Sequence, residues 1–251
     1  MSVLALALLS IGVADLVGLR SWGQPARAAV VSCAAGLVTL ALLALLADLT
    51  SGADLLLLLV AAGTLCGWVL TSAGERHLPA ALSLSIAAAG LAVLLLGSGG
   101  ASMADGALSR WLGWTGLPAT DVPAGPDTVL LVAGLLLVQV ATANKVVRLV
   151  LTQIGALGPS GLPQASDRLR GGRILGPMER LIILGLGLAG EVTAASLVIA
   201  AKGLIRWPEL QQSDLAEPDA VGVDDVTEYF LVGSMVSWTF ALLGLAAARL
   251  L

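Results

Sequence analysis

Two carboxylates fall inside apolar stretches of this chain and are the first residues that could carry chemistry. Glu191 lies near the middle of an apolar stretch over 181–203, and Asp15 lies near the end of another over 2–19. Ionisable residues within a membrane are costly, so they mark ion paths or proton relays by default. For Glu191 we weigh a proton- or cation-binding position against a structural hydrogen bond. For Asp15, about a turn before Arg20, we favour a structural or topological role.

A second set of ionisable residues flanks a segment over 153–178 that is rich in Gly and Pro. Lys145 and Arg148 share a helix face because they are three residues apart, and Glu179 could pair with either. With Arg180, they predict either a site for phosphate or an anionic lipid headgroup, or topology determinants with one structural ion pair. We favour the second interpretation. The arginines that would extend an anion site are Arg168, Arg170 and Arg173.

Other chemistries find little support in the residue types. The two cysteines, Cys33 and Cys66, lie in apolar stretches and show no metal-ligand spacing, and the one histidine lies between stretches. We therefore predict no metal and no cofactor. The glycines over 185–190 imitate a dinucleotide-binding fingerprint, but they lie in an apolar helix rather than a strand-turn-helix unit. The last apolar stretch has no lysine that could form a Schiff base with retinal.

Seven apolar stretches must position these groups, and each approaches the ~20 residues that a membrane-crossing helix needs. They cover 2–19, 28–47, 54–72, 79–97, 128–150, 181–203 and 228–250. The chain is 57% hydrophobic and 12% charged, and the segments between stretches are too short to form a core of their own. The sequence therefore predicts one domain over 1–251, an all-α integral membrane protein with a bundle of about seven transmembrane helices.

One segment between the stretches, 98–127, has a helical signal of its own. Leu108, Trp111 and Leu112 would share a helix face, which predicts a short interfacial helix over 104–115. Trp111 and Trp114 would then lie at headgroup depth. A loop with two ordinary interfacial tryptophans is the alternative interpretation.

The basic residues sort onto one side of the seven stretches. If the N-terminus is outside, only Arg110, Lys202 and Arg206 of the 13 Lys and Arg residues fall outside, so ten fall inside. This distribution follows the positive-inside rule and predicts an outer N-terminus and a cytoplasmic C-terminus. The outer segments are acidic, which argues against a nucleic-acid partner. We expect the partners to be the lipid bilayer and anionic lipid headgroups at the cytoplasmic face.

Three segments in the last third of the chain carry a family resemblance. They read Gly172-Arg173-Ile174-Leu175-Gly176-Pro177-Met178-Glu179-Arg180, Ala200-Ala201-Lys202-Gly203-Leu204-Ile205-Arg206 and Glu228-Tyr229-Phe230-Leu231-Val232-Gly233. Over about residues 130–245 the chain resembles the C-terminal module of an uncharacterised family of bacterial multi-spanning inner-membrane proteins, catalogued as a domain of unknown function. The resemblance implies no activity. It singles out Gly172, Gly176, Lys202, Arg206, Glu228 and Tyr229, beside Glu179 and Arg180.

These features favour a small non-enzymatic protein of a bacterial inner membrane. We expect a membrane-embedded component of a homo-oligomer or of a complex with another protein, with ion or lipid handling as its task. One alternative is a proton- or cation-coupled transporter that uses Glu191. The other is an enzyme that acts on lipid-phosphate headgroups at the cytoplasmic rim. The chain has little soluble mass for independent catalysis, so we favour the non-enzymatic interpretation.

Overall fold

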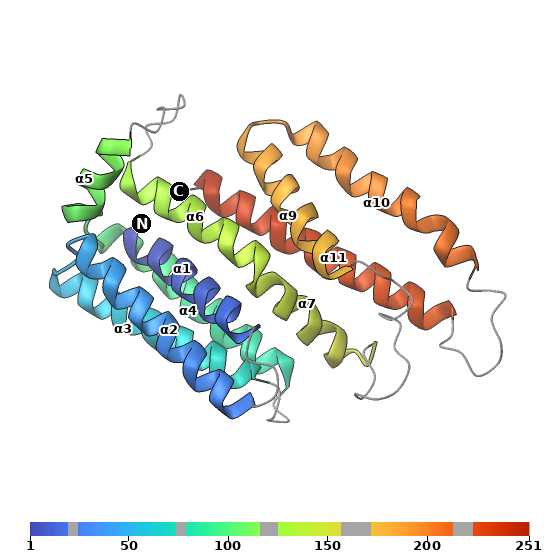
Figure 1. The fold of residues 1–251 in the computed structure, drawn as a ribbon, viewed down its shortest axis with the longest axis horizontal. Coiled ribbons are helices and arrows are strands. Elements are labelled where there is room, and N and C mark those ends of the chain that lie inside the picture. Colours follow the sequence, from blue (N-terminus) through green and yellow to red (C-terminus); the bar gives the residue numbers. More distant parts are fainter. Residues whose placement is uncertain (20–24, 74–78, 116–124, 157–171, 213–222, 251) are drawn as a thin grey trace. The chain divides into compact units, whose positions relative to one another are not determined.

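The computed structural model of the chain describes residues 1–19, 25–73, 79–115, 125–156, 172–212 and 223–250. The described residues form helices and no strand (Figure 1). The chain divides into two compact units, Met1–Thr142 and Ala143–Leu250, called unit 1 and unit 2 below. The predicted all-α class is confirmed. The predicted single domain over 1–251 stays a prediction.

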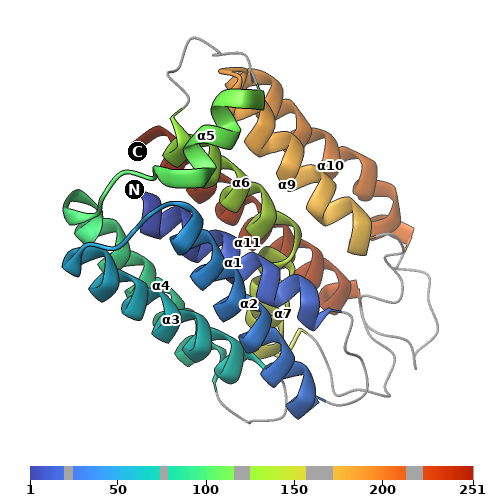
Figure 2. The same cartoon turned by 60° about the vertical axis from the view of Figure 1, so that its left-hand side comes forward.

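Unit 1 is built around its first helix. The helices are α1 Ser2–Gly18, α2 Pro25–Leu46, α3 Gly52–Ser72, α4 Ala80–Gly97, α5 Gly106–Thr115 and α6 Pro126–Val140, with a 3-10 turn, η1, over Ser98–Gly100. Helix α1 packs against α2, α3 and α6, while α4 packs mainly against α3 (Figures 1 and 2). Most residues of α1 are buried. An apolar helix without a polar face suits that central position, because a helix that is hydrophobic all round has to be covered.

Glycines allow α1 and α6 to approach closely. A Cβ at Gly134 would lie 3.0 Å from the Cβ of Leu8 and 3.1 Å from the backbone oxygen of Ala5. A Cβ at Gly12 would lie 2.7 Å from the Cγ of Leu137. Small residues at such contacts let two helix backbones come together, as they do in membrane bundles.

Four helices are long and apolar enough to cross a membrane, within 26–46, 52–72, 80–100 and 228–249. Helices α6 and α7 (Thr142–Gln153) form a bent pair that would provide a fifth span. Helix α1 and the first part of α10 are shorter apolar helices. Apolar helices of this length are compatible with a membrane protein. The finer expectation of seven spans stays a prediction.

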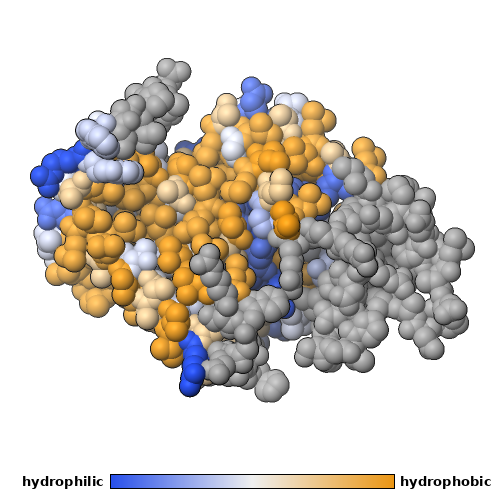
Figure 3. Space-filling model, in the orientation of Figure 1, coloured by the Kyte–Doolittle hydropathy of each residue, from blue (hydrophilic) through white to orange (hydrophobic). Residues whose placement is uncertain are grey.

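The outer faces of the candidate spans in unit 1 are apolar. Leu45 of α2 is 75% exposed, Leu59 of α3 is 70% exposed and Leu96 of α4 is 86% exposed. Hydrophobic side chains predominate over the described helices of unit 1 in the face shown in Figure 3. Contiguous apolar surface of this kind needs lipid or another protein to cover it.

Unit 2 contains α7 together with α9 Gly172–Leu188, α10 Val192–Gln212 and α11 Val223–Leu250. Helices α9 and α10 run antiparallel as a hairpin (Figure 1), and α11 packs mainly on α9. Close packing of α9 on α11 depends on Gly187, where a Cβ would lie 2.4 Å from the Cδ2 of Leu245. Arg249, near the end of α11, donates from Nη2 to the backbone oxygen of Gly187 at 3.0 Å. A cation there satisfies a carbonyl at the C-terminus of α9.

The predicted single helix over 181–203 is wrong. The chain turns back between α9 and α10, and Gly190 has φ +85°. The backbone N–H of Glu191 donates to the oxygen of Leu186 at 2.8 Å, and that of Gly190 donates to the oxygen of Gly187 at 3.2 Å. These two bonds form a Schellman motif, which ends a helix where glycine adopts the left-handed conformation. Hydropathy alone hid the turn, because apolar residues continue on both sides of it.

Two other predicted elements are refined. The stretch over 128–150 forms two helices, since the helical path breaks at Ala141 between α6 and α7. The helix expected over 104–115 is confirmed as α5, with Trp111 and Trp114 exposed. Its position at a membrane surface stays a prediction.

Candidate functional site

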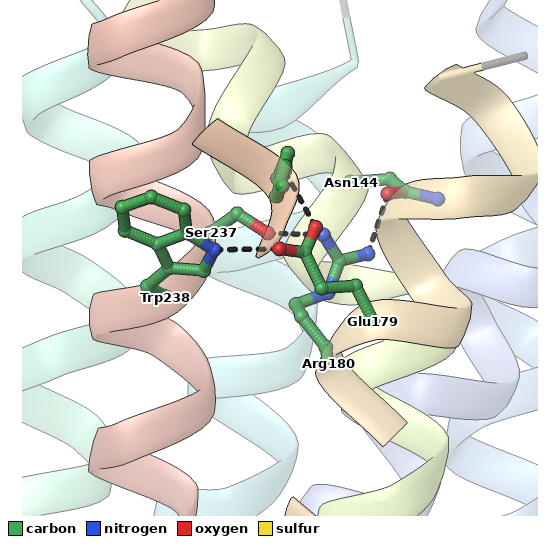
Figure 4. A network of polar contacts seen from close by, with 6 residues as sticks. Asn144, Glu179, Arg180, Ser237 and Trp238 are labelled. Carbon is green, nitrogen blue, oxygen red and sulfur yellow. Dashed lines mark hydrogen bonds and ion pairs between the residues drawn. The ribbon is translucent and has the colours of Figure 1, made fainter. Parts of the chain in front are cut away.

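The most distinctive site is a group of polar and charged side chains inside unit 2, which we call the unit 2 cluster (Figure 4). Its members come from four helices: Asn144 of α7, Glu179 and Arg180 of α9, Lys202 of α10, and Ser237 and Trp238 of α11. Glu179 and Arg180 are adjacent in sequence, so their side chains leave α9 in different directions. Each therefore contacts a different set of neighbours.

Glu179 joins α9 to the two helices that follow it. Its Oε2 accepts a hydrogen bond from Nζ of Lys202 at 2.5 Å, and its Oε1 accepts one from Nε1 of Trp238 at 2.8 Å. The side chains of Glu179 and Lys202 are 5% and 16% exposed. The Lys202 ammonium also lies over the Trp238 ring, 5.6 Å from its centroid, where the negative face of the indole attracts a cation.

Arg180 joins α9 to α7 and α11. Its Nη1 donates to Oγ of Ser237 at 2.9 Å, and its Nη2 donates to Oδ1 of Asn144 at 2.6 Å. Only 1% of Arg180 is exposed. Gly176 lies one turn earlier, and a Cβ there would be 3.5 Å from Nη1 of Arg180. A Cβ at position 176 would therefore make an ordinary van der Waals contact with the guanidinium.

The cluster is an electrostatic network rather than a single ion pair. Lys202 pairs with the carboxylate of Glu179, the guanidinium of Arg180 also interacts electrostatically with that carboxylate, and oxygens of Asn144 and Ser237 each accept one hydrogen bond from the guanidinium. Buried charges are tolerated only when they are paired and hydrogen-bonded, and removing one partner of such a network is expensive. The cluster should therefore fix how the helices of unit 2 pack.

The predicted partners of Glu179 were wrong. We expected Lys145 or Arg148 to pair with it, but Lys202 occupies that role. Lys145 is half-buried on α7, and Arg148 is exposed. The expected link between α9 and the end of the apolar stretch over 128–150 does exist, but it runs through Arg180 and Asn144.

Of the predicted rim site, the structure describes the side chains of Lys145, Arg148, Glu179 and Arg180. The last two side chains are buried within unit 2. Arg168 and Arg170 lie outside the described residues, and so do the side chains of Arg173 and Arg206. Of the positions singled out by the family resemblance, Gly172 begins α9, Gly176 borders Arg180, Lys202 pairs with Glu179, Glu228 is exposed and Tyr229 is half-buried.

Glu191 does not lie in the middle of a helix, as the sequence had suggested. It follows Gly190 in the turn between α9 and α10 and is exposed. Its backbone oxygen accepts from the N–H of Ala195 at 3.1 Å, so Glu191 opens α10. A carboxylate is favourable there, because the N-terminus of a helix carries partial positive charge. The predicted mid-helix position of Glu191 is therefore wrong, and its role within a membrane stays a prediction.

In unit 1, Asp15 contacts a neutral donor. Nε1 of Trp68, on α3, lies 2.9 Å from Oδ2 and 3.2 Å from Oδ1 of Asp15, so the carboxylate links α1 to α3. Both residues are buried.

The sequence interpretation missed a second buried carboxylate in unit 1, Asp54. Ser51 and Asp54 form a capping box at the start of α3, and Oδ1 of Asp54 also accepts from the backbone N–H of Ser102 at 2.8 Å. The Ser-x-x-Asp spacing before an apolar run is the signal that would have found the cap. No comparable signal marks Asn144, Ser237 and Trp238 as partners of residues on α9, because their contacts span 36 to 59 residues.

Among the described residues, no group of three His, Cys, Asp or Glu side chains could hold a metal ion. Comparison with known proteins adds no assignment: no family model, no curated protein and no solved structure matches this chain. The family resemblance of the last third therefore stays a prediction. What the site can do has to be argued from the unit 2 cluster and from the apolar helix faces.

Proposed function

We propose that this chain is a non-enzymatic multi-pass protein of a bacterial plasma membrane, embedded there as a component of a homo-oligomer or of a complex with another membrane protein. The apolar outer faces of α2, α3 and α4 carry the proposal. Leucines on all three helices are more than two-thirds exposed, and only lipid or protein can cover them favourably. The polar groups of unit 2, by contrast, face one another within the bundle.

The hairpin changes the proposed topology. The pairing of Glu179 with Lys202 and the turn at Gly190 support a topology in which the start of α9 and the end of α10 lie on the same side of the membrane. This holds whether the hairpin crosses the bilayer twice or enters and leaves from one side. We keep the N-terminus outside, so the segments 157–171 and 213–222 are both cytoplasmic in this proposal.

The positive-inside rule allows this arrangement as well as the seven-span one. Of the 13 Lys and Arg residues, Arg110 and Arg249 would fall outside, and Arg180 and Lys202 lie within the hairpin, which leaves nine inside. The many acidic residues after α10 do not oppose it, because Asp and Glu contribute little to the rule. The Glu179–Lys202 ion pair supports the hairpin arrangement, which charge counting alone does not favour over the seven-span one.

Cysteine labelling tests the topology. In a background without Cys33 and Cys66, Ser160→Cys and Ser213→Cys should both react with an impermeant maleimide only from the cytoplasm. Ser109→Cys, in α5, should react from outside and serves as the control. Reaction of Ser160→Cys and Ser213→Cys from opposite sides would restore a single crossing over 181–203.

The assembly state tests the proposed function. Purified in mild detergent and again in nanodiscs, the protein should show a mass above that of one 25.2 kDa chain, or should retain a second membrane protein. Light scattering and native mass spectrometry measure this directly. A strictly monomeric protein that exchanges cations across liposomes would contradict the proposal and favour a transporter.

A cation-coupled transporter is the second candidate, and the observation that favours it is the buried Glu179–Lys202 pair. Ionisable residues inside a membrane bundle commonly line substrate or ion pathways. Its residues would be Glu179 and Lys202 instead of Glu191, which is exposed in a turn. Flux in liposomes that is lost in Glu179→Gln, with folding retained, would support it. The lipid-phosphate enzyme loses support, because Glu179 and Arg180 are held in the interior of unit 2.

A further inference from the structure

We propose that Glu179 and Trp238 form a binding site for an organic ammonium ion, which the side chain of Lys202 fills in this structure. The inference goes beyond the proposed role in an oligomer or complex, and it does not depend on it. It assigns a ligand class to a site that otherwise reads as an internal ion pair.

The chemistry of the site is that of ammonium recognition. A carboxylate supplies the opposite charge, and the face of an indole supplies a negative electrostatic surface. Both are present: Nζ of Lys202 is 2.5 Å from Oε2 of Glu179 and 5.6 Å from the centroid of the Trp238 ring. The Lys202 ammonium is therefore placed as the head of an alkylammonium ligand would be.

The site is fixed without help from Lys202. The indole N–H of Trp238 donates to Oε1 of Glu179 at 2.8 Å, so the ring and the carboxylate hold each other in place. This hydrogen bond also occupies one of the two carboxylate oxygens. Metal cations such as Ca²⁺ require six to eight oxygen ligands, whereas an ammonium needs one anionic partner and can use the aromatic face. The geometry thus favours an organic ammonium over a metal ion.

Lys202 can leave the site more easily than Glu179 can. Its side chain is 16% exposed, compared with 5% for Glu179, and it projects from α10, a helix whose residues Leu197 and Leu204 are both exposed. A lysine has a long flexible stem that can carry its ammonium toward water while the stem stays on apolar surface. Release would therefore begin with rotation of the Lys202 side chain on α10.

Competition at Lys202 tests the proposal in the intact wild-type protein. The chain has only two lysines, Lys145 and Lys202, so the amine-labelling rate of each can be measured by mass spectrometry. Benzyltrimethylammonium is a suitable probe, because it does not react with amine reagents. We expect it to raise the labelling rate of Lys202 several-fold over sodium chloride at the same ionic strength, with Lys145 unchanged. An unchanged labelling rate of Lys202 would show that the organic ammonium ion does not displace the Lys202 side chain, and it would overturn the proposal.

Chemical rescue tests the site itself. In Lys202→Ala, propylammonium should raise the melting temperature in a concentration-dependent way, since a ligand that binds only the folded state stabilises it. The double variant Lys202→Ala with Glu179→Gln should show no such rise. Lys202→Met provides a second background if the alanine variant does not fold. A rise of equal size in the double variant, or none in the single variants, would show that Glu179 does not form an ammonium site.

Discussion

Units 1 and 2 bury carboxylates in different ways. In unit 1, Asp15 and Asp54 accept hydrogen bonds from neutral groups, namely an indole N–H, a hydroxyl and backbone N–H groups. In unit 2, Glu179 faces the ammonium of Lys202, and Arg180 lies directly beside it in the chain. Both arrangements join segments far apart in the sequence, but the Glu179–Lys202 contact is an ion pair, and removing one partner of a buried ion pair leaves an uncompensated charge.

The difference matches how each unit is held together. Unit 1 wraps several helices around the apolar α1, so its packing would persist without any one polar contact. In unit 2, the buried apolar cluster formed by Ile183, Ala195 and Ala241 is small. There the charged contacts of Glu179 and Arg180 connect all four helices. We therefore expect unit 2 to depend more strongly on its polar residues than unit 1 does.

The largest effect should come from Glu179→Ala. It leaves Lys202 and Arg180 without their carboxylate, and breaking a buried charge network in this way costs about 3–5 kcal/mol. Unfolding in a mild detergent with a denaturant titration measures the loss. Glu228→Ala, an exposed position on α11, is the control and should change stability by less than about 0.5 kcal/mol. Equal losses in the two variants would mean that the cluster contributes no more than a surface charge.

A smaller effect is expected in unit 1 from Trp68→Phe. The change removes the indole donor of Asp15 but keeps most of the aromatic volume, and leaving a buried acceptor with one fewer partner costs about 1–3 kcal/mol. Trp111→Phe on the exposed face of α5 controls for the loss of an indole. If Trp68→Phe destabilises the protein more than Glu179→Ala does, the contrast between the units fails.

Gly190→Ala should destabilise the protein as much as Trp68→Phe does, or less. A left-handed residue other than glycine costs roughly 1–2 kcal/mol, and Gly190 has φ +85°. Gly185→Ala, on the helix that ends just before Gly190, is a matched control, since a Cβ there meets open space. Alanine at that helical position should stabilise by roughly 0.5–1 kcal/mol. A melting temperature that falls in Gly190→Ala and rises in Gly185→Ala would support a left-handed turn at Gly190.

Glu191→Leu should have the smallest effect, within about 0.5 kcal/mol, because the side chain is exposed. A carboxylate buried at the membrane midplane would respond differently, since its removal would leave partner groups unsatisfied. A melting temperature several degrees below wild type would therefore contradict the turn position.

The sequence predicted the helices whose apolar residues form uninterrupted runs. The stretches over 28–47, 54–72, 79–97 and 228–250 correspond to α2, α3, α4 and α11. Hydropathy failed where a helix ended inside an apolar run, because a window of about 20 residues cannot detect a single left-handed glycine. Gly190 followed by an acidic residue was the local signal, and it was interpreted as part of a continuous helix.

The candidate site was only partly predictable. Glu179, Arg180 and Lys202 were all singled out, but the first two were placed on the opposite side of the membrane from Lys202. That error follows directly from the missed turn, which brings residues 23 positions apart into contact. The contributions of Asn144 and Ser237 depend on packing between helices far apart in sequence, and no pattern of spacing encodes them.

The hairpin also has a consequence for biosynthesis. As it emerges from the ribosome, α9 contains Glu179 before its partner Lys202 has been made, and a charged residue at a helix centre costs about 2.5–3.5 kcal/mol in translocon insertion. Its partner Lys202 is made 23 residues later, which at 5–20 residues per second is roughly 1–5 s. We expect α9 to wait at the translocon or the membrane interface during that interval. It would then enter the bilayer together with α10, with Glu179 already paired to Lys202.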